Sequence, residues 1–341
     1  MLKRDSPVSL DVVIPLYDEE QTLGLLLARL RETFAPPRLA EGGIARIRHV
    51  VVDDGSTDRS AALVAEAIEA GFPALLLRLS RNFGHQSAVS AGLAESDADV
   101  VAVIDADLQD PPELIFAMLE RWREGFDVVY ARRRRRTGSL VKRAGYWLFY
   151  RLVAFLADID IPLDSGDFCL LDRRVVRTIG EMPETLRFPR VLRAWVGFRQ
   201  TGIDYDRPPR QAGRAKYTLS RLYRLATDGV VSASVRPLQV AQVFSVTYLL
   251  VILGLGALVL ARMPLWSELG VPTWALISYV LILSGNFVQV FCIYILGAYL
   301  GRTYLEVKAR PPYVLLEVVG GPPDNQGEQT AGEHEEPHSS R

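Results

Sequence analysis

Three side chains that carry oxygen follow an apolar run of the sequence, each separated from the next by one residue. The run covers residues 100–104, and Asp105, Asp107 and Gln109 come after it, ahead of a pair of prolines. Because alternate residues of an extended chain share a face, the two carboxylates can act together. Hard carboxylate and amide oxygens suit Mg²⁺ or Mn²⁺, which can bridge to phosphate oxygens. The stretch therefore predicts a divalent-metal site, and its alternative interpretation is a loop whose acids cap the next helix.

A second apolar run ends in Asp53 and Asp54, directly ahead of a glycine turn. These carboxylates can accept hydrogen bonds from a base N–H or from ribose hydroxyls, whereas the plainer interpretation is a turn that caps a helix. An earlier run is stopped by Pro15, and Tyr17 and Glu19 follow it in a predicted loop. Each of these polar groups thus stands where a predicted strand ends.

The elements that must position these residues alternate between strand and helix patterns. The predicted strands are 8–15, 47–53, 74–80, 99–107 and 126–133, and the predicted helices are 19–34, 58–71, 85–96 and 111–125. Such alternation with continuous apolar strands predicts an α/β fold with a mostly parallel sheet covered by helices on both faces. Ligands bind these sheets beyond the carboxyl ends of the strands, where the acidic motifs fall.

The charges are distributed unevenly along the 341 residues, although the net charge is only −1. Residues 1–131 carry 12 Lys/Arg against 22 Asp/Glu, and residues 132–224 carry 21 against 9. An acidic and a basic half indicate two surfaces with different partners. The two cysteines, Cys169 and Cys292, are too few for a disulfide framework or a zinc site, so we expect unpaired thiols in a reducing compartment.

Two stretches near the carboxyl end contain no charged residue, residues 237–261 and residues 269–301. Each exceeds the roughly 20 apolar residues that cross a bilayer. We therefore expect a transmembrane hairpin within 236–302, with helices at about 237–261 and 274–300. Lys and Arg crowd its outer flanks, so the positive-inside rule places both termini and the catalytic half in the cytoplasm.

Residues 139–157 have a helical pattern but are too short and too charged to span a membrane. Because four aromatic residues cluster at 146–150, we expect a helix in the membrane interface, with an ordinary amphipathic core helix as the alternative. Residues 216–231 are a second interfacial candidate. The predicted organisation is a domain at 1–235, the hairpin, a cytoplasmic segment at 303–320 and a polar, disordered tail at 321–341.

Several motifs, taken in order, resemble those of family 2 glycosyltransferases, which have the Rossmann-like GT-A fold. These are VVIPLYDEE, VVDDGSTDRS, LSRNFGHQSAVSAGL and IDADLQDPPELI. More narrowly, DVVYARRRRR, DSGDFCLLDRRVV, RFPRVLRAWVGFRQ and RQAGRAKYTLSRL resemble the polyprenyl-phosphate glycosyltransferases, the GtrB, ArnC and dolichol-phosphate mannose synthase group. The resemblance runs from about Val8 to Val314. It implies transfer of a sugar from a nucleotide to a lipid phosphate, with inversion at the anomeric carbon.

The resemblance also implies roles for individual residues. The residues expected to bind the nucleotide-sugar are Pro15, Tyr17, Glu19, Asp53, Asp54 and Asn82. Asp107, with Asp105 and Gln109, would hold Mg²⁺ or Mn²⁺ on the diphosphate. Asp167 resembles the family's proposed catalytic base, and Asp105 is the second catalytic candidate, since whether Asp105 contacts metal or sugar stays open.

A basic role for Asp167 is hardly required, because a phosphate monoester with a second pKa of about 6 is already largely ionised at pH 7. Orientation of arginine side chains and stabilisation of positive charge on the sugar ring are its alternatives. The basic half would hold the lipid phosphate, because arginine grips phosphate in a fork. The expected residues are Arg132, Arg143, Arg210 and Lys216, while Arg134–136 are expected to attract anionic lipid.

The sequence thus predicts a metal-dependent, inverting glycosyltransferase of the bacterial inner membrane. Its donor would be a nucleotide-sugar, with UDP favoured over GDP, and its acceptor undecaprenyl or dolichyl phosphate; the sugar stays open, and no nucleic acid is expected. A homo-oligomer is expected, a tetramer by the family resemblance, with Asn286 and Gln289 facing a partner helix. The alternatives are a processive polysaccharide synthase, which needs more membrane helices, and a non-catalytic lipid-sugar binding or flippase-associated protein.

Overall fold

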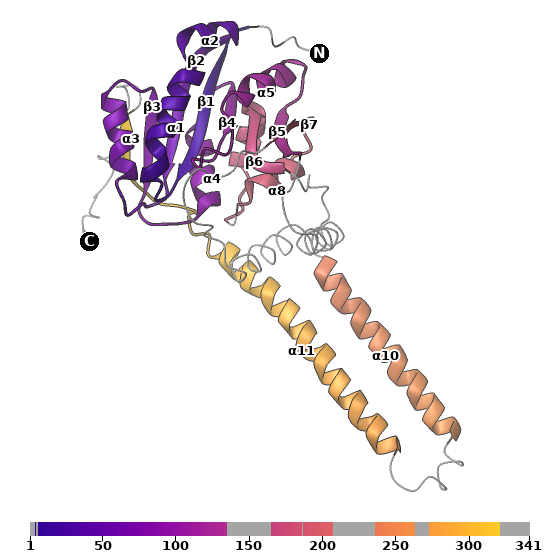
Figure 1. Ribbon diagram of the computed structural model, residues 1–341. Coiled ribbons are helices and arrows are strands. Elements are labelled where there is room, and N and C mark those ends of the chain that lie inside the picture. Colours follow the sequence, from indigo (N-terminus) through magenta and orange to yellow (C-terminus); the bar gives the residue numbers. More distant parts are fainter. Residues whose placement is uncertain are drawn as a thin grey trace, which may run out of the picture.

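The computed structural model describes residues 4, 6–134, 165–185, 187–206, 236–262 and 273–320. They form an α/β domain from which two long helices extend (Figure 1). The strands are β1 Val8–Leu16, β2 Ile44–Asp53, β3 Ala74–Leu79, β4 Val100–Val103, β5 Val128–Arg133, β6 Ser165–Asp172, β7 Gln200–Tyr205 and β8 Leu315–Gly320. The helices are α1 Glu20–Thr33, α2 Pro36–Glu41, α3 Ser60–Glu69, α4 His85–Glu95, α5 Leu114–Arg123, α7 Arg173–Gly180, α8 Pro189–Trp195, α10 Arg236–Arg262 and α11 Thr273–Val307.

The eight strands form one sheet in the order β7-β5-β6-β4-β1-β2-β3-β8. β1, β2, β3 and β4 pair in parallel, and β5 pairs in parallel with β7. β6 is antiparallel to both β4 and β5, and β8 is antiparallel to β3. The predicted mostly parallel sheet is therefore confirmed. The carboxyl ends of six strands and the amino end of β6 share one edge.

Helices cover both faces of this sheet, because alternate strand residues point to opposite sides and both sides are apolar. One core packs α1, α3 and α5 on residues such as Val12 and Ile14. The other core packs α4, α7 and α8 on residues such as Val13 and Val52. The predicted two-sided covering is confirmed.

Several elements are additional to the predicted ones: α2, α7, α8 and the strands β6, β7 and β8. The strand expected at 99–107 ends already at Val103, so its acids lie in the following loop. The segment at 303–320 begins with the last turns of α11, which run to Val307, and then returns to the domain as β8.

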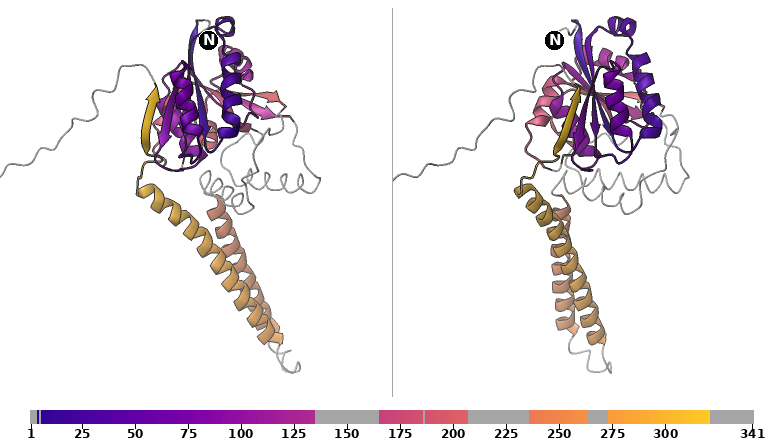
Figure 2. Two further views of the ribbon diagram at one scale, coloured as in Figure 1. Left: turned by 60° about the vertical axis from the view of Figure 1, so that its left-hand side comes forward. Right: turned by 90° about the vertical axis from the view of Figure 1, so that its left-hand side faces the viewer.

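The helices α10 and α11 lie side by side and leave the domain at the edge where the parallel strands end (Figures 1 and 2). The Tyr248 hydroxyl donates a hydrogen bond to the Leu281 carbonyl of the other helix. At the domain, the Glu306 carboxylate accepts a 2.8 Å hydrogen bond from the backbone N–H of Thr185, and the N–H of Ser80 donates to the carbonyl of Val314 at 2.9 Å. The helix pair is thus tied to the same edge as the acidic motifs.

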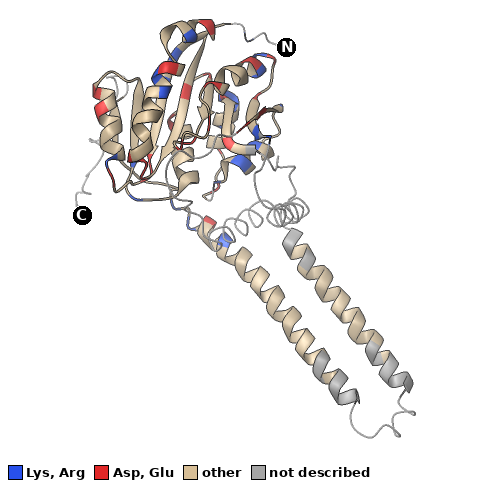
Figure 3. Ribbon diagram, viewed as in Figure 1, with Lys and Arg blue, Asp and Glu red and all other residues tan. Residues whose placement is uncertain are grey.

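Figure 3 shows few charged residues along the coloured parts of the helix pair. Many of its apolar side chains are exposed, among them Phe287, Val290 and Leu300. Within the described residues, one helical stretch, Leu281–Val307, is long and apolar enough to cross a membrane, and a shorter apolar stretch covers Ala241–Gly254. The two-span topology therefore stays a prediction. Asn286 and Gln289 are exposed, and their contact with a partner helix also stays a prediction.

Several predicted features fall outside the described residues. They are the interfacial helices at 139–157 and 216–231, the tail at 321–341, and the phosphate-binding candidates Arg143, Arg210 and Lys216.

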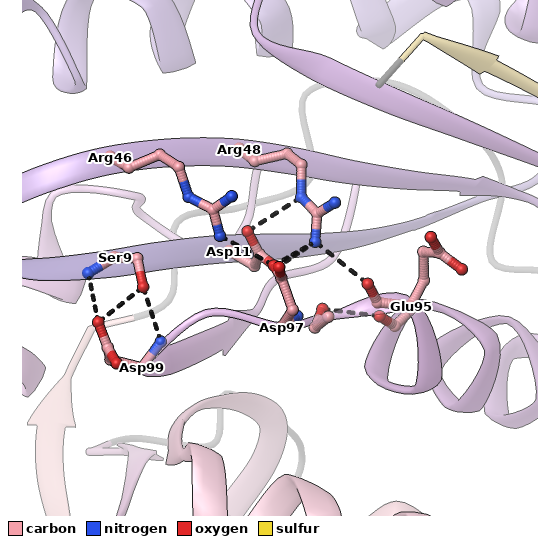
Figure 4. Close-up of polar contacts among 9 residues, drawn as sticks. Ser9, Asp11, Arg46, Arg48, Glu95, Asp97 and Asp99 are labelled. Atoms are coloured by element: carbon pink, nitrogen blue, oxygen red, sulfur yellow. Dashed lines mark hydrogen bonds and ion pairs between the residues drawn. The ribbon is translucent and has the colours of Figure 1, made fainter. Parts of the chain in front are cut away.

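A charged network joins β1 and β2 to the loop before β4 (Figure 4). Because this loop precedes β4 whereas the acidic motifs follow their strands, the network lies away from the edge that carries those motifs. Asp11 is fully buried in β1 and accepts two hydrogen bonds from the Arg48 guanidinium, at 3.2 and 2.6 Å. Arg48 also bonds Asp97, whose backbone N–H donates to Asp11. This buried pair is stabilising only while both partners are present.

Candidate active site

The register of β4 and β6 brings two predicted catalytic residues together. Val103 pairs with Cys169 in the antiparallel ladder. Continuing this ladder by two residues sets Asp105, beyond the end of β4, opposite Asp167 in β6. The parallel strands alone could not do this, because only a reversed strand begins at the edge where the others end.

His85, at the first turn of α4, lies between these two acids. Its Nε2 is 3.3 Å from Oδ2 of Asp167 and 3.8 Å from Oδ1 of Asp105. From the other side, Nη2 of Arg190 donates a 3.2 Å hydrogen bond to Oδ1 of Asp167. Both oxygens of the Asp167 carboxylate therefore face a cationic partner.

This arrangement shifts the proton affinities of the three groups. Burial opposes a charge on His85, yet the hydrogen bond to Asp167 and the charge of Asp105 outweigh it and raise the pKa of His85 to about 8. Burial alone would raise the pKa of Asp167, but the hydrogen bond from His85 and the charge of Arg190 hold that pKa well below its ordinary value. Burial and then the charge of Asp110 raise the pKa of Asp105 to about 7. Asp167 is thus a firmly ionised carboxylate and a poor proton acceptor at neutral pH.

The loop after β4 is held by hydrogen bonds to the carboxylates of Asp110 and Asp107. Buried Asp110 accepts hydrogen bonds from the backbone N–H of Asp105 at 3.3 Å and from the Tyr205 hydroxyl at 2.9 Å. The N–H of Gln109 donates to Oδ1 of Asp107 at 3.1 Å. Leu108 has a φ of +60°, which is uncommon for a residue with a side chain and is frequent at functional sites. The loop therefore holds the three predicted ligands in one defined conformation.

These ligands fit a divalent cation in part. Among the described residues, no group of three or more His, Cys, Asp and Glu side chains forms a metal cage. Mg²⁺ is commonly held by one or two carboxylates together with substrate phosphates, so a full cage is not required. The half-buried Asp105 and Asp107, with Gln109 beside them, offer that kind of incomplete hard-oxygen site. The pKa of Asp105 is raised by burial and then by the negative charge of Asp110, and a bound cation would offset both effects.

The predicted nucleotide residues lie at the carboxyl ends of β1 and β2 and in the loops after β1, β2 and β3, all at the same edge. Pro15 is buried in β1, while Tyr17 and Glu19 are half-buried and Asn82 is exposed. Gly55 needs its glycine, because its φ is +68° and a Cβ there would lie 2.5 Å from the backbone of Arg81. The β2–α3 and β3–α4 loops are therefore packed directly together.

Two of these acids are engaged by the protein itself. Oδ1 of Asp53 accepts a 3.1 Å hydrogen bond from the N–H of Ser56. The two oxygens of buried Asp54 accept hydrogen bonds from the N–H groups of Phe83 and Gly84, at 2.7 and 2.9 Å. Asp54 thus fixes the loop that leads into His85, and direct contact of Asp53 and Asp54 with a nucleotide stays a prediction.

Arg132 is the one predicted lipid-phosphate residue within the described part of the chain. Its guanidinium forms a fork with the Asp204 carboxylate of the neighbouring strand β7, at 2.5 and 3.1 Å. Phosphate binding by Arg132 therefore stays a prediction, and it would have to compete with this pair.

His85 and Arg190 are not among the residues predicted for the site, although both lie in the motifs that carry the resemblance. His85 opens a predicted helix, and this position at a predicted strand–helix junction was the available indication. Arg190 is one of many arginines in the basic half, and only the fold distinguishes it from the others.

Comparisons with known proteins show which proteins this chain is similar to. Residues 11–180 match the model of the family described as glycosyl transferase family 2. An uncharacterized glycosyltransferase of Synechocystis sp. is 39% identical over 92% of this chain and 96% of its own length. A prophage bactoprenol glucosyl transferase homolog of Escherichia coli is 32% identical over 91% of this chain and 99% of its own length. A solved mannosyltransferase of Pyrobaculum calidifontis, in complex with GDP-Man and Mn²⁺, is 16% identical, with a TM-score of 0.43 and coverage of 89% and 88%.

Proposed function

The chain belongs to glycosyltransferase family 2, and on this basis we propose that it moves a monosaccharide from a nucleotide-sugar to a polyprenyl phosphate. A UDP-sugar is the favoured donor, and undecaprenyl or dolichyl phosphate is the acceptor. The reaction takes place at the cytoplasmic face of a bacterial inner membrane and depends on Mg²⁺ or Mn²⁺.

One observation carries the proposal: the loop after β4 and the start of β6 meet at the edge from which the apolar helices extend. A donor held by that loop is then close to an acceptor that arrives from a membrane. The similarity to a bactoprenol glucosyl transferase homolog over nearly the whole chain supports the same acceptor class.

In the reaction, a phosphate oxygen of the acceptor attacks the anomeric carbon while the bond from that carbon to the nucleoside diphosphate breaks, and the configuration inverts. The attacking oxygen is already largely ionised at neutral pH, so Asp167 need not remove a proton. Held ionised by His85 and Arg190, Asp167 is suited to stabilise positive charge that develops on the sugar ring.

Asp107, Asp105 and Gln109 would hold the divalent metal against the donor diphosphate, with Tyr17, Glu19 and the acids after β2 around the nucleotide. The metal supplies charge stabilisation of the departing diphosphate. On the acceptor side, Arg132 and the arginines and lysine outside the described residues would bind the lipid phosphate.

The membrane part of the proposal is a two-helix hairpin with both termini in the cytoplasm. The exposed apolar residues of α10 and α11 support burial in lipid or against further copies in a homo-oligomer, because exposed apolar patches of this size mark interaction surfaces.

The proposal is tested by a donor screen with the purified full-length protein. UDP- and GDP-sugars are supplied in turn, with Mn²⁺ or Mg²⁺ and with undecaprenyl or dolichyl phosphate in mild detergent, and labelled lipid product is measured. We expect one donor to give a lipid-linked monosaccharide. Absence of transfer from every donor to both acceptors, from protein that unfolds cooperatively, would reject the proposed reaction.

A further inference from the structure

Arg193 is a buried arginine next to the candidate site. It lies in α8 with only 2% of its surface exposed. Burial of a guanidinium costs several kcal/mol unless partners compensate it, so arginine is rarely buried without a specific use. Arg193 is not among the residues to which the proposed reaction assigns a role.

The surroundings of Arg193 connect it to Asp167. Its guanidinium carbon lies 5.4 Å from the ring centroid of Tyr130 in β5, and its side chain hydrogen-bonds the buried thiol of Cys169 in β6. A small pocket beneath the site is lined by Arg193, Cys169 and Asp167 together with Arg190 and apolar side chains. The positive charge of Arg193 also favours the ionised form of Asp167. The arginine therefore supplies charge to the site from its inner side.

The helix that carries Arg193 depends on such contacts. α8 has seven residues, and so short a helix is not stable without tertiary packing. Its buried residues are Leu192 and Arg193. Arg190 and Arg193 are one turn apart, and like charges at this spacing repel each other. Asp167 offsets that repulsion, because it accepts a hydrogen bond from Arg190 and lines the same pocket as Arg193.

We propose that Arg193 is a positioning residue whose buried charge holds Asp167 and Arg190 in their arrangement at the site. This inference rests on the proposed function, because its role is to prepare Asp167 for the sugar. A packing role alone is the competing explanation, and the two differ in one respect. Packing needs only the volume of the side chain, whereas positioning needs its charge.

Arg193→Met separates these explanations, because methionine keeps an apolar stem of similar length. Removal of one buried charge lowers stability, but Asp167 keeps its contacts with His85 and Arg190, so we expect a folded variant, and cooperative unfolding checks this. We expect kcat to fall by roughly tenfold or more, the equivalent of about 1.4 kcal/mol of transition-state stabilisation. KM for the donor should stay within about a factor of two, because no contact with the nucleotide is lost. Arg193→Lys should retain part of kcat, since it keeps the charge without the fork.

Moving the guanidinium provides a rescue. The double variant Arg193→Ala, Cys169→Arg brings the guanidinium into the same pocket from β6 and nearly conserves the total side-chain volume. Arg193→Ala should lower log kcat relative to the wild type, and we expect the double variant to recover at least half of that decrease. Arg199→Met is the matched control, because Arg199 is exposed and stacks on Phe126 away from the pocket, and it should keep wild-type kcat. Full kcat in Arg193→Met would overturn the proposal, as would a folded double variant no better than Arg193→Ala.

A measurement without substrate keeps the inference distinguishable from the proposed reaction. Thermal unfolding is compared for the wild type, Arg193→Met, Asp167→Asn and the variant that combines Arg193→Met with Asp167→Asn. Asp167→Asn should lower Tm less in the Arg193→Met background than in the wild type, because one uncompensated charge fewer is left. Equal losses of Tm in the two backgrounds would reject positioning by charge, whatever the donor screen gives.

Discussion

Replacing Asp54 with asparagine should loosen the loop that carries His85. In the structure both oxygens of the buried Asp54 carboxylate accept backbone N–H groups, from Phe83 at 2.7 Å and from Gly84 at 2.9 Å. Asparagine keeps one acceptor oxygen, but its NH₂ group, which is a donor, then faces the donor of the second backbone N–H. One charge-assisted bond is lost and one buried donor is left without an acceptor.

The magnitude follows from these two changes. A hydrogen bond to a charged group contributes about 1.5–3 kcal/mol, and an unsatisfied buried donor costs about 1–3 kcal/mol. Burial raises the pKa of Asp54 although the two amides favour its charged form, so desolvation already offsets part of the gain. We therefore expect a loss of about 2–4 kcal/mol in the free energy of unfolding, equivalent to a fall in Tm of roughly 5–10 °C.

Thermal unfolding of the nucleotide-free protein in detergent measures this directly. Asp58→Asn is the matched control, because Asp58 also accepts two backbone N–H groups, from Glu20 and Ser60, but is partly exposed. The control should lose at most about 0.5 kcal/mol, since asparagine also caps well and water replaces the lost bond. An Asp54→Asn protein with unchanged Tm and a raised KM for the donor would refute the reasoning and support direct contact with the nucleotide.

Three further changes test other parts of the structure. Arg48→Met leaves the fully buried Asp11 without its fork, and we expect a loss of about 3–5 kcal/mol in denaturant unfolding, with kcat per folded molecule unchanged. Burial lowers the pKa of His49 to about 4 in the folded protein, whereas the pKa in the unfolded chain is the ordinary 6.5. Below pH 6.5 the unfolded chain therefore binds more protons at His49 than the folded protein does. The free energy of unfolding should therefore fall as the pH drops from 6.5 to 4, by about 3 kcal/mol at pH 4. His49→Phe should remove this contribution, which is measured by denaturant unfolding at a series of pH values. Asp107→Asn should lower kcat about 100-fold or more in the transfer assay, because a metal contributes several kcal/mol of charge stabilisation. Chelation by EDTA should abolish transfer in the wild type, and added Mn²⁺ should restore it.

The first half of the fold could be predicted from the sequence because its signals are local. The apolar runs that end near Leu16, Asp53 and Val103 are buried on both faces. Each can be recognised from its own residues, without knowledge of the strand beside it. Their shared direction then places the polar residues after them at one edge, as observed. The same reasoning could not show that Asp54 is occupied by the loop at Phe83, because that loop is distant in sequence.

The second half of the site depends on contacts that no local pattern specifies. β6 is a strand because it pairs antiparallel with β4 and β5, and only this reversal brings Asp167 beside Asp105. α8 is short and rich in arginine, so it lacks the apolar periodicity by which a helix is recognised, and the tertiary contacts of Leu192 and Arg193 determine its place. The residues that the sequence left unassigned, His85 and Arg190, contact Asp167 from two different helices. The role that we propose for them follows from that convergence on one carboxylate: they hold Asp167 ionised, where the family resemblance alone implied a base.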